Sequence, residues 1–176
     1  MRKADLRKLI ISAMLLTVGI VLPLLTSQIK EIGDTLLPMH LPVFMGGLLL
    51  GWMPGLIIGA LTPLLSSLLT GMPPLIPSLP MMFVELALFG LVSGYLYHDK
   101  RKNIYFALIT AMIVGRLGAA FVLMLFSDIL GIKLHPLTYV AATFMTGLAG
   151  VIFQIVFIPI LVKRLEHIFS YEVHKS

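Results

Sequence analysis

The 176-residue chain contains no cysteine and few charged residues, which make up 12% of it. Without cysteine it can form neither disulfides nor thiolate metal sites, and it has no glycine-rich phosphate-binding motif. Soluble domains have about 25% charged and about 45–50% apolar residues. This chain is 59% hydrophobic, with a mean hydropathy of +1.03. A soluble chain of this length could not bury so much apolar surface, so the composition indicates an integral membrane protein.

Apolar runs divide the chain into segments of about the length that a membrane-spanning helix needs, which is about 20 residues. The expected fold is an all-α integral membrane protein, with residues 1–176 forming one compact domain of six transmembrane helices and no separate soluble domain. These helices are expected at about 6–25, 39–50, 54–70, 78–97, 104–126 and 137–162. The basic start and the first apolar run resemble a signal peptide. They lack a small-x-small cleavage site, and we interpret them as a retained first helix.

The distribution of lysine and arginine predicts the orientation. With six crossings, the N-terminus, the turn at 51–54, the loop at 98–103 and the C-terminal tail lie on one side. Nearly all of the basic residues lie there too, and only Lys30 and Lys133 fall on the other side. Because cytoplasmic loops are rich in Lys and Arg, both termini are expected in the cytoplasm. Five or seven crossings would split the basic clusters between the two sides.

The second apolar run, at about 39–50, is too short to cross about 30 Å of hydrocarbon at 1.5 Å per residue. Proline-rich stretches flank the hairpin that it forms with the third run, and both lie at its outer mouth. Irregular backbone at membrane depth survives only where protein or water satisfies its polar groups. The short run therefore indicates a cavity at the outer mouth. A tilted short helix within an ordinary bundle is the alternative.

Two ionisable residues, Glu85 and Arg116, fall inside predicted membrane helices. Each costs about 2.5–3.5 kcal/mol on insertion scales unless it is paired or functional. Their expected depths differ by roughly 6 Å, which long side chains on neighbouring helices can bridge. One interpretation is a structural ion pair. The other is that Arg116 receives an anionic ligand, because a guanidinium matches a carboxylate. Both hold if Glu85 orients Arg116 and the ligand takes the remaining donors.

Several uncharged polar residues gather toward the same mouth. His40 lies between Pro38 and Pro42 and is expected either to contact a ligand or to cap a helix. Hydroxyl side chains in membrane helices commonly bond back to their own helix, which is the alternative to a ligand contact for the serines and threonines. The further candidates for ligand contact are Ser66, Ser67, Thr70, Thr143 and Thr146, together with Gln154, which is expected deeper in the sixth helix. No metal-ligand spacing and no nucleophile–base set is present in the sequence.

Small residues at spacings of four indicate close helix contact. They include Gly47, Gly51, Gly55 and Gly59, and packing within the bundle is favoured for them over a partner interface. In the first helix, Ala13 and Thr17 form a weaker pattern of the same kind.

The chain resembles the substrate-binding S components of energy-coupling factor (ECF) vitamin transporters. The resemblance rests on size, on six helices with both termini inside, and on the stretches LPMHLPV at 37–43 and LTPLLSSLLTGMPP at 61–74. It implies a bacterial plasma-membrane protein that captures a water-soluble vitamin from outside. It also implies a transmembrane coupling subunit and two cytoplasmic ATPases as partners, so ATP is used by those partners and this chain needs no cofactor. The family's Ala-x-x-x-Ala docking pattern is matched only by Ala13-x-x-x-Thr17.

The resemblance does not name the vitamin. Arg116 favours a carboxylate, and the few aromatic residues near the outer mouth disfavour a large stacked ring. Pantothenate fits both points and is the first candidate, followed by niacin, a pyridoxine-like vitamin and a thiamin precursor. The predicted site comprises Arg116, Glu85, His40, Ser66 and Thr146.

Two other classes of function remain. A self-sufficient transporter or channel would show internal repeats or polar residues through the whole bundle, whereas here they crowd toward one mouth. A membrane enzyme would need a catalytic set at one depth, and Glu85 with His40 is too small a set.

Overall fold

The computed structural model describes residues 3–26, 39–76, 78–130, 148 and 150–166. Its helices are α1 (Lys3–Thr26), α3 (His40–Leu50), α4 (Trp52–Thr70), α5 (Ser78–Ser93), the π-helix η1 (Gly94–Asp99) and α6 (Ile104–Leu130). A further helix occupies residues 150–166. Thr143, Thr146 and the outer part of the predicted sixth helix lie outside the described residues.

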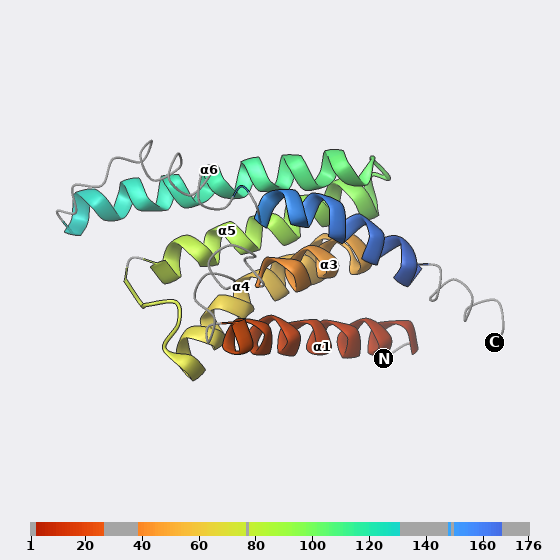
Figure 1. Cartoon of the computed structure of the whole chain (residues 1–176), viewed down its shortest axis with the longest axis horizontal. Helices are drawn as coiled ribbons and strands as arrows, with labels where there is room; N and C mark the ends of the chain where they lie inside the picture. The colour runs from red at the N-terminus through yellow and green to blue at the C-terminus, as the bar shows by residue number, and fades with distance from the viewer. Residues whose placement is uncertain (1–2, 27–38, 77, 131–147, 149, 167–176) are drawn as a thin grey trace.

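The described helices form a bundle in which α1 and α6 lie at opposite edges, with α3, α4 and α5 between them (Figure 1). The core is apolar and includes Phe44, Phe89 and Leu108. The helix at 150–166 contributes Ile158 and Val162 to the same core. This arrangement brings α3, α5, α6 and the last described helix around one interior region.

Four helices are long and apolar enough to cross a membrane: Asp5–Leu25, Trp52–Thr70, Ser78–Asp99 and Ile104–Phe126. They correspond to the first, third, fourth and fifth predicted spans, so the all-helical membrane fold is confirmed. The predicted short second run is α3, an apolar helix of 11 residues. The predicted total of six crossings depends in part on residues outside the described ranges.

The break between α3 and α4 lies at Gly51. This residue has φ +103°, a left-handed conformation that glycine adopts without steric cost. Its N–H donates to the Gly47 carbonyl and its own carbonyl accepts from the Gly55 N–H, so Gly51 is hydrogen-bonded to both helices. The predicted start of the third helix at Pro54 is wrong, because α4 begins at Trp52. Pro54 lies in the first turn, where its missing N–H would have no intrahelical partner in any case.

The backbones of α4 and α5 are in direct contact, which explains why glycines lie at the contact positions. A Cβ atom added at Gly55 would collide with the Gly90 carbonyl, and one at Gly90 would collide with the Gly55 carbonyl. One turn along α4, a Cβ atom at Gly59 would collide with the Leu86 carbonyl. The prediction that these glycines pack within the bundle is confirmed.

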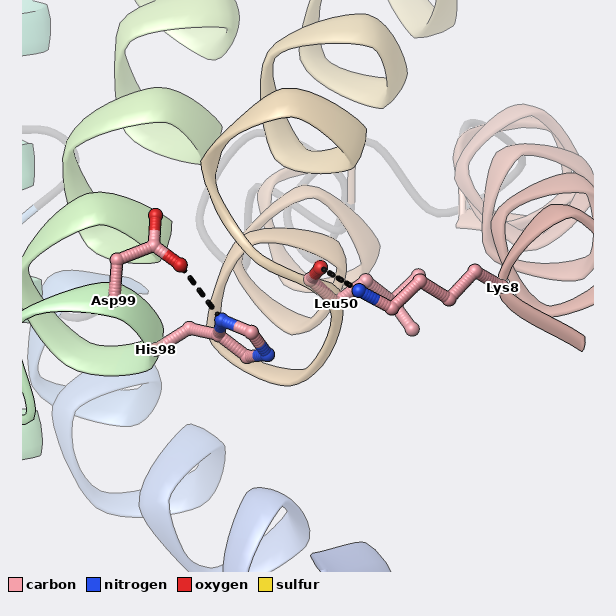
Figure 2. Close-up of polar contacts among 4 residues, drawn as sticks. All are labelled: Lys8, Leu50, His98 and Asp99. Carbon is pink, nitrogen blue, oxygen red and sulfur yellow. Dashed lines mark hydrogen bonds and ion pairs between the residues drawn. The ribbon is translucent and has the colours of Figure 1, made fainter. Parts of the chain in front are cut away.

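One end of the bundle gathers polar contacts from segments far apart in sequence. Lys8 Nζ donates to the Leu50 carbonyl at 3.5 Å, and His98 Nδ1 lies 2.8 Å from Asp99 Oδ1 (Figure 2). A Cβ atom added at Gly51 would lie 3.2 Å from that His98 nitrogen. At the C-terminal side, the Tyr97 hydroxyl donates to Glu166 Oε2 at 3.0 Å. The start of α1, the α3–α4 turn, the end of η1 and the end of the last described helix therefore share this end.

Candidate functional site

Glu85 and Arg116 form an ion pair inside the bundle. Glu85 lies on α5 and Arg116 on α6, and Arg116 Nη1 is 2.8 Å from Glu85 Oε1. Both residues are buried, with 3% of Glu85 and 7% of Arg116 exposed. The two residues predicted from the sequence to lie within reach of each other are therefore in contact, from the two helices expected.

The pair is held by charge and not by an aligned hydrogen bond. Although Glu85 Oε1 lies within ion-pair distance of Arg116, it accepts no hydrogen bond from any residue in the described ranges. A guanidinium carries five N–H donors and commonly binds a carboxylate through two parallel hydrogen bonds. Among the described residues, Glu85 is the one ion-pair partner of Arg116. The pair thus leaves donors of Arg116 and an acceptor of Glu85 available.

His40, at the first position of α3, lies inside the bundle and not at a surface mouth. It is 2% exposed, and its ring meets the Phe89 ring edge-on at a centroid distance of 5.1 Å. The Phe44 ring stacks on the Phe89 ring, with their centroids 4.9 Å apart. The N-cap of α3 is Met39, with no side-chain capping hydrogen bond, so the alternative of a capping His40 is wrong.

Gln154, on the helix at 150–166, is the second partner of His40. Its Nε2 lies 3.5 Å from His40 Nδ1, and the residue is 1% exposed. Phe89, which the His40 ring contacts, lies one helical turn from Glu85 on α5, so His40 lies near the level of the ion pair. We call His40, Glu85, Arg116 and Gln154 the polar cluster. It draws one residue from each of four helices.

The α5–α6 contact fixes the backbone around the polar cluster. A Cβ atom added at Gly115 would collide with the Phe89 ring and lie 2.9 Å from the Glu85 carbonyl oxygen. The two helices therefore touch directly at this level and leave no room between their backbones.

The hydroxyl residues at the end of α4 bind the following loop. Ser66 Oγ donates to the Met72 carbonyl and Ser67 Oγ to the Pro73 carbonyl, each at 2.8 Å. Thr70 Oγ1 donates back to the Ser66 carbonyl at 2.8 Å. Their donor hydrogens are used to hold the 71–74 loop against α4. Ser66 was predicted as a ligand contact, and the structure does not place it in contact with the polar cluster; that role stays a prediction.

Ala13 and Thr17 lie exposed on α1, at the edge of the bundle. Thr17 Oγ1 donates to the Ala13 carbonyl at 2.9 Å, so the hydroxyl is satisfied within its own helix. This face presents small side chains outward and is separate from the polar cluster. Within the described ranges, no group of three or more His, Asp or Glu side chains is placed to hold a metal ion.

Gln154 is one of the further candidates for ligand contact that the sequence predicts. Its contact with His40 spans 114 positions. Sequence spacing carries no signal for such a contact between separate helices. Phe89 was not predicted, because a phenylalanine in an apolar helix is indistinguishable from the rest of the core.

The fold and the polar cluster define a helical membrane protein with buried polar groups drawn from several helices. The chain belongs to the family described as ECF transporter, substrate-specific component, whose model matches residues 7–162. This family comprises transporter subunits and not enzymes. No curated protein and no solved structure matches the chain.

Proposed function

We propose that the chain captures a water-soluble vitamin at the outer side of the bacterial plasma membrane and holds it at the polar cluster. The observation that carries the proposal is the buried Glu85–Arg116 pair, in which Glu85 Oε1 accepts no hydrogen bond from the described residues. Buried polar groups in proteins are nearly always hydrogen-bonded, so an unsatisfied one needs an explanation, and a bound cargo would provide it here. The substrate-binding role of the family supports the same assignment.

A carboxylate is the group that Arg116 suits best. The guanidinium fork matches the two oxygens of a carboxylate, and the low dielectric of the bundle strengthens that bond. Pantothenate is the first candidate, and niacin, a pyridoxine-like vitamin and a thiamin precursor follow. The bound vitamin then contacts the polar cluster, with Thr146 and Ser66 as further predicted contacts.

The test is a binding screen of the detergent-purified protein against a vitamin panel, with the Arg116→Ala variant measured alongside. We expect tight binding of one carboxylate vitamin and a loss of roughly tenfold or more in affinity in the variant, because a charge-assisted hydrogen bond is worth about 1.5–3 kcal/mol. Since Arg116→Ala leaves Glu85 unpaired, the double variant Glu85→Ala/Arg116→Ala is the control for folding. A double variant that binds as tightly as the wild type would exclude Arg116 from the vitamin site.

Transport requires partners, which we propose are a transmembrane coupling subunit and two cytoplasmic ATPases. These ATPases use the ATP, and this chain carries no cofactor of its own. The exposed small residues Ala13 and Thr17 are the proposed docking positions on α1, since small side chains allow close helix approach.

Co-purification with co-expressed coupling subunit and ATPases tests the partnership. We expect the complex to form with the wild-type chain and to be lost or weakened in Ala13→Leu. The matched control is Met14→Leu, because Met14 is an exposed neighbour on the same helix and its substitution keeps the size of the side chain. Equal recovery from both variants would move the docking face elsewhere.

A further inference from the structure

Glu85 is the most poorly satisfied buried polar residue in the part of the chain that the structure describes. Its carboxylate is almost fully enclosed, its Oε1 atom accepts no hydrogen bond there, and its one close polar neighbour is Arg116. Leaving a buried acceptor without a donor costs about 1–3 kcal/mol, and more for a charged group. A residue whose only task was to neutralise Arg116 would be more stable in an aligned, two-bond pair.

The charges of the polar cluster already balance when it is empty. The ion pair joins one positive charge, on Arg116, to one negative charge, on Glu85, and the amide of Gln154 is uncharged. A cargo carboxylate that entered beside Arg116 would add a second negative charge close to Glu85. Like charges in a low-dielectric interior repel strongly. A hydrogen-bond donor on the cargo, lying between the two carboxylates, removes much of that repulsion and satisfies Oε1.

The neighbours of Glu85 do not supply that donor. Nη1 of Arg116 contacts Oε1 without the alignment of a hydrogen bond, and Gln154 Nε2 lies against His40 Nδ1. On the α6 side, Gly115 packs directly on the Glu85 carbonyl and on Phe89, so no side chain can be inserted there. The described residues around Glu85 therefore leave its Oε1 atom without a donor.

We propose that Glu85 is a specificity-determining residue that selects cargo carrying an O–H or N–H donor next to the group that faces Arg116. This inference rests on the proposed function, since it concerns the same site. It adds that a carboxylate alone is not sufficient for tight binding. Sites built to hydrogen-bond a substrate O–H or N–H discriminate strongly against analogues that lack it, because the polar group of the site is then left unpaired.

The experiment uses two sets of probes, each with one scaffold. Nicotinate is an anion without a donor at the substituent, nicotinamide is neutral with N–H donors, and methyl nicotinate is neutral without them. Pantothenate, pantothenol and the methyl ester of pantothenate form the second set: an anion, a neutral probe with an O–H at the terminal group, and a neutral probe without a donor there. Affinities are measured for the full-length wild type, for Glu85→Gln, and for Ser93→Ala. Ser93 is a buried polar control on α5 whose hydroxyl donates to the Phe89 carbonyl of its own helix.

In the wild type we expect each donor-bearing probe to bind roughly tenfold or more tightly than its methylated counterpart. Glu85→Gln should reduce that ratio at least severalfold, because a neutral amide oxygen accepts more weakly than a carboxylate. The same variant should raise the affinity for nicotinate, because it removes the competing negative charge. Ser93→Ala should leave both the affinity ratio of donor-bearing to methylated probes and the affinity for nicotinate as in the wild type.

A purely structural role of Glu85 would weaken all the probes of a set in parallel, and that result overturns the proposal. Equal wild-type affinity for the donor-bearing and methylated probes overturns it too, as does wild-type protein that binds neither set. Failure of the proposed function is a separate outcome, namely no binding to any member of the whole vitamin panel.

Discussion

The members of the Glu85–Arg116 pair depend on each other for stability as well as for binding. Replacing one member of a buried pair leaves the other as an uncompensated charge, whereas replacing both removes the charges together. The helix backbones around the pair are in close contact, with Gly115 against Phe89 and the Glu85 carbonyl. The pair should therefore show strong thermodynamic coupling.

We predict that Arg116→Ala destabilises the protein by about 3–5 kcal/mol, and that adding Glu85→Ala recovers a large part of the loss. The measurement is the thermal unfolding midpoint in detergent of the wild type, both single variants and the double variant. A double variant whose loss equals the sum of the two single losses would show that the two residues are not coupled.

Residue identity alone was sufficient to predict this pair, because an ionisable residue within an apolar helix is costly and needs a partner. The same reasoning could not predict that His40 is buried in the bundle, or which residues it contacts. Its neighbours, Phe89 and Gln154, come from two other helices, and the proline-rich surroundings indicated a mouth and not the interior. Side-chain neighbours between helices depend on how the helices rotate and tilt, which sequence spacing does not specify. Thr146 stays a prediction, because it lies outside the described residues.

At the scale of elements, the α4–α5 contact depends on the absence of two side chains. Gly55 and Gly90 place their backbones against each other, and Gly47 also packs against the Gly90 carbonyl. Association of helices in a membrane relies on such close packing, because lipid tails are as apolar as leucine and provide no hydrophobic drive. The sequence predicted close helix contact from the small residues at every fourth position, but it did not predict that α5 is the helix that α4 contacts.

Gly90→Ala should therefore be destabilising by about 1–3 kcal/mol, as expected for overpacking against rigid backbone. Gly118→Ala is the matched control, since its new methyl group would meet the end of the half-buried Leu88 side chain, which can turn away. Both changes improve helix propensity equally, by up to about 1 kcal/mol. The comparison is made by thermal unfolding in detergent. Equal stability of the two variants would show that the α4–α5 contact tolerates a methyl group.

At the scale of the whole molecule, the two ends of the bundle differ in character. The end defined by the α3–α4 turn and η1 carries exposed aromatic side chains at Trp52, Tyr95 and Tyr105, beside the basic run 100–102. Aromatic residues are enriched at membrane interfaces, and Lys and Arg on the cytoplasmic side. The opposite end carries the 71–76 loop, with Met72, Leu75 and Ile76 exposed. Because α4 joins the two ends directly, a single crossing separates them.

This polarity predicts the sidedness of two positions, Lys102 and Met72. The chain has no cysteine, so Lys102→Cys and Met72→Cys each introduce the only thiol that a maleimide can label. Both positions are exposed. In intact cells, a membrane-impermeant maleimide should label Met72→Cys and spare Lys102→Cys, which should react only after the cells are opened. The unmodified chain is the background control. Labelling of Lys102→Cys from outside would reverse the orientation and place the polar cluster nearer the opposite face. Labelling of both from the same side would mean that α4 does not cross the membrane.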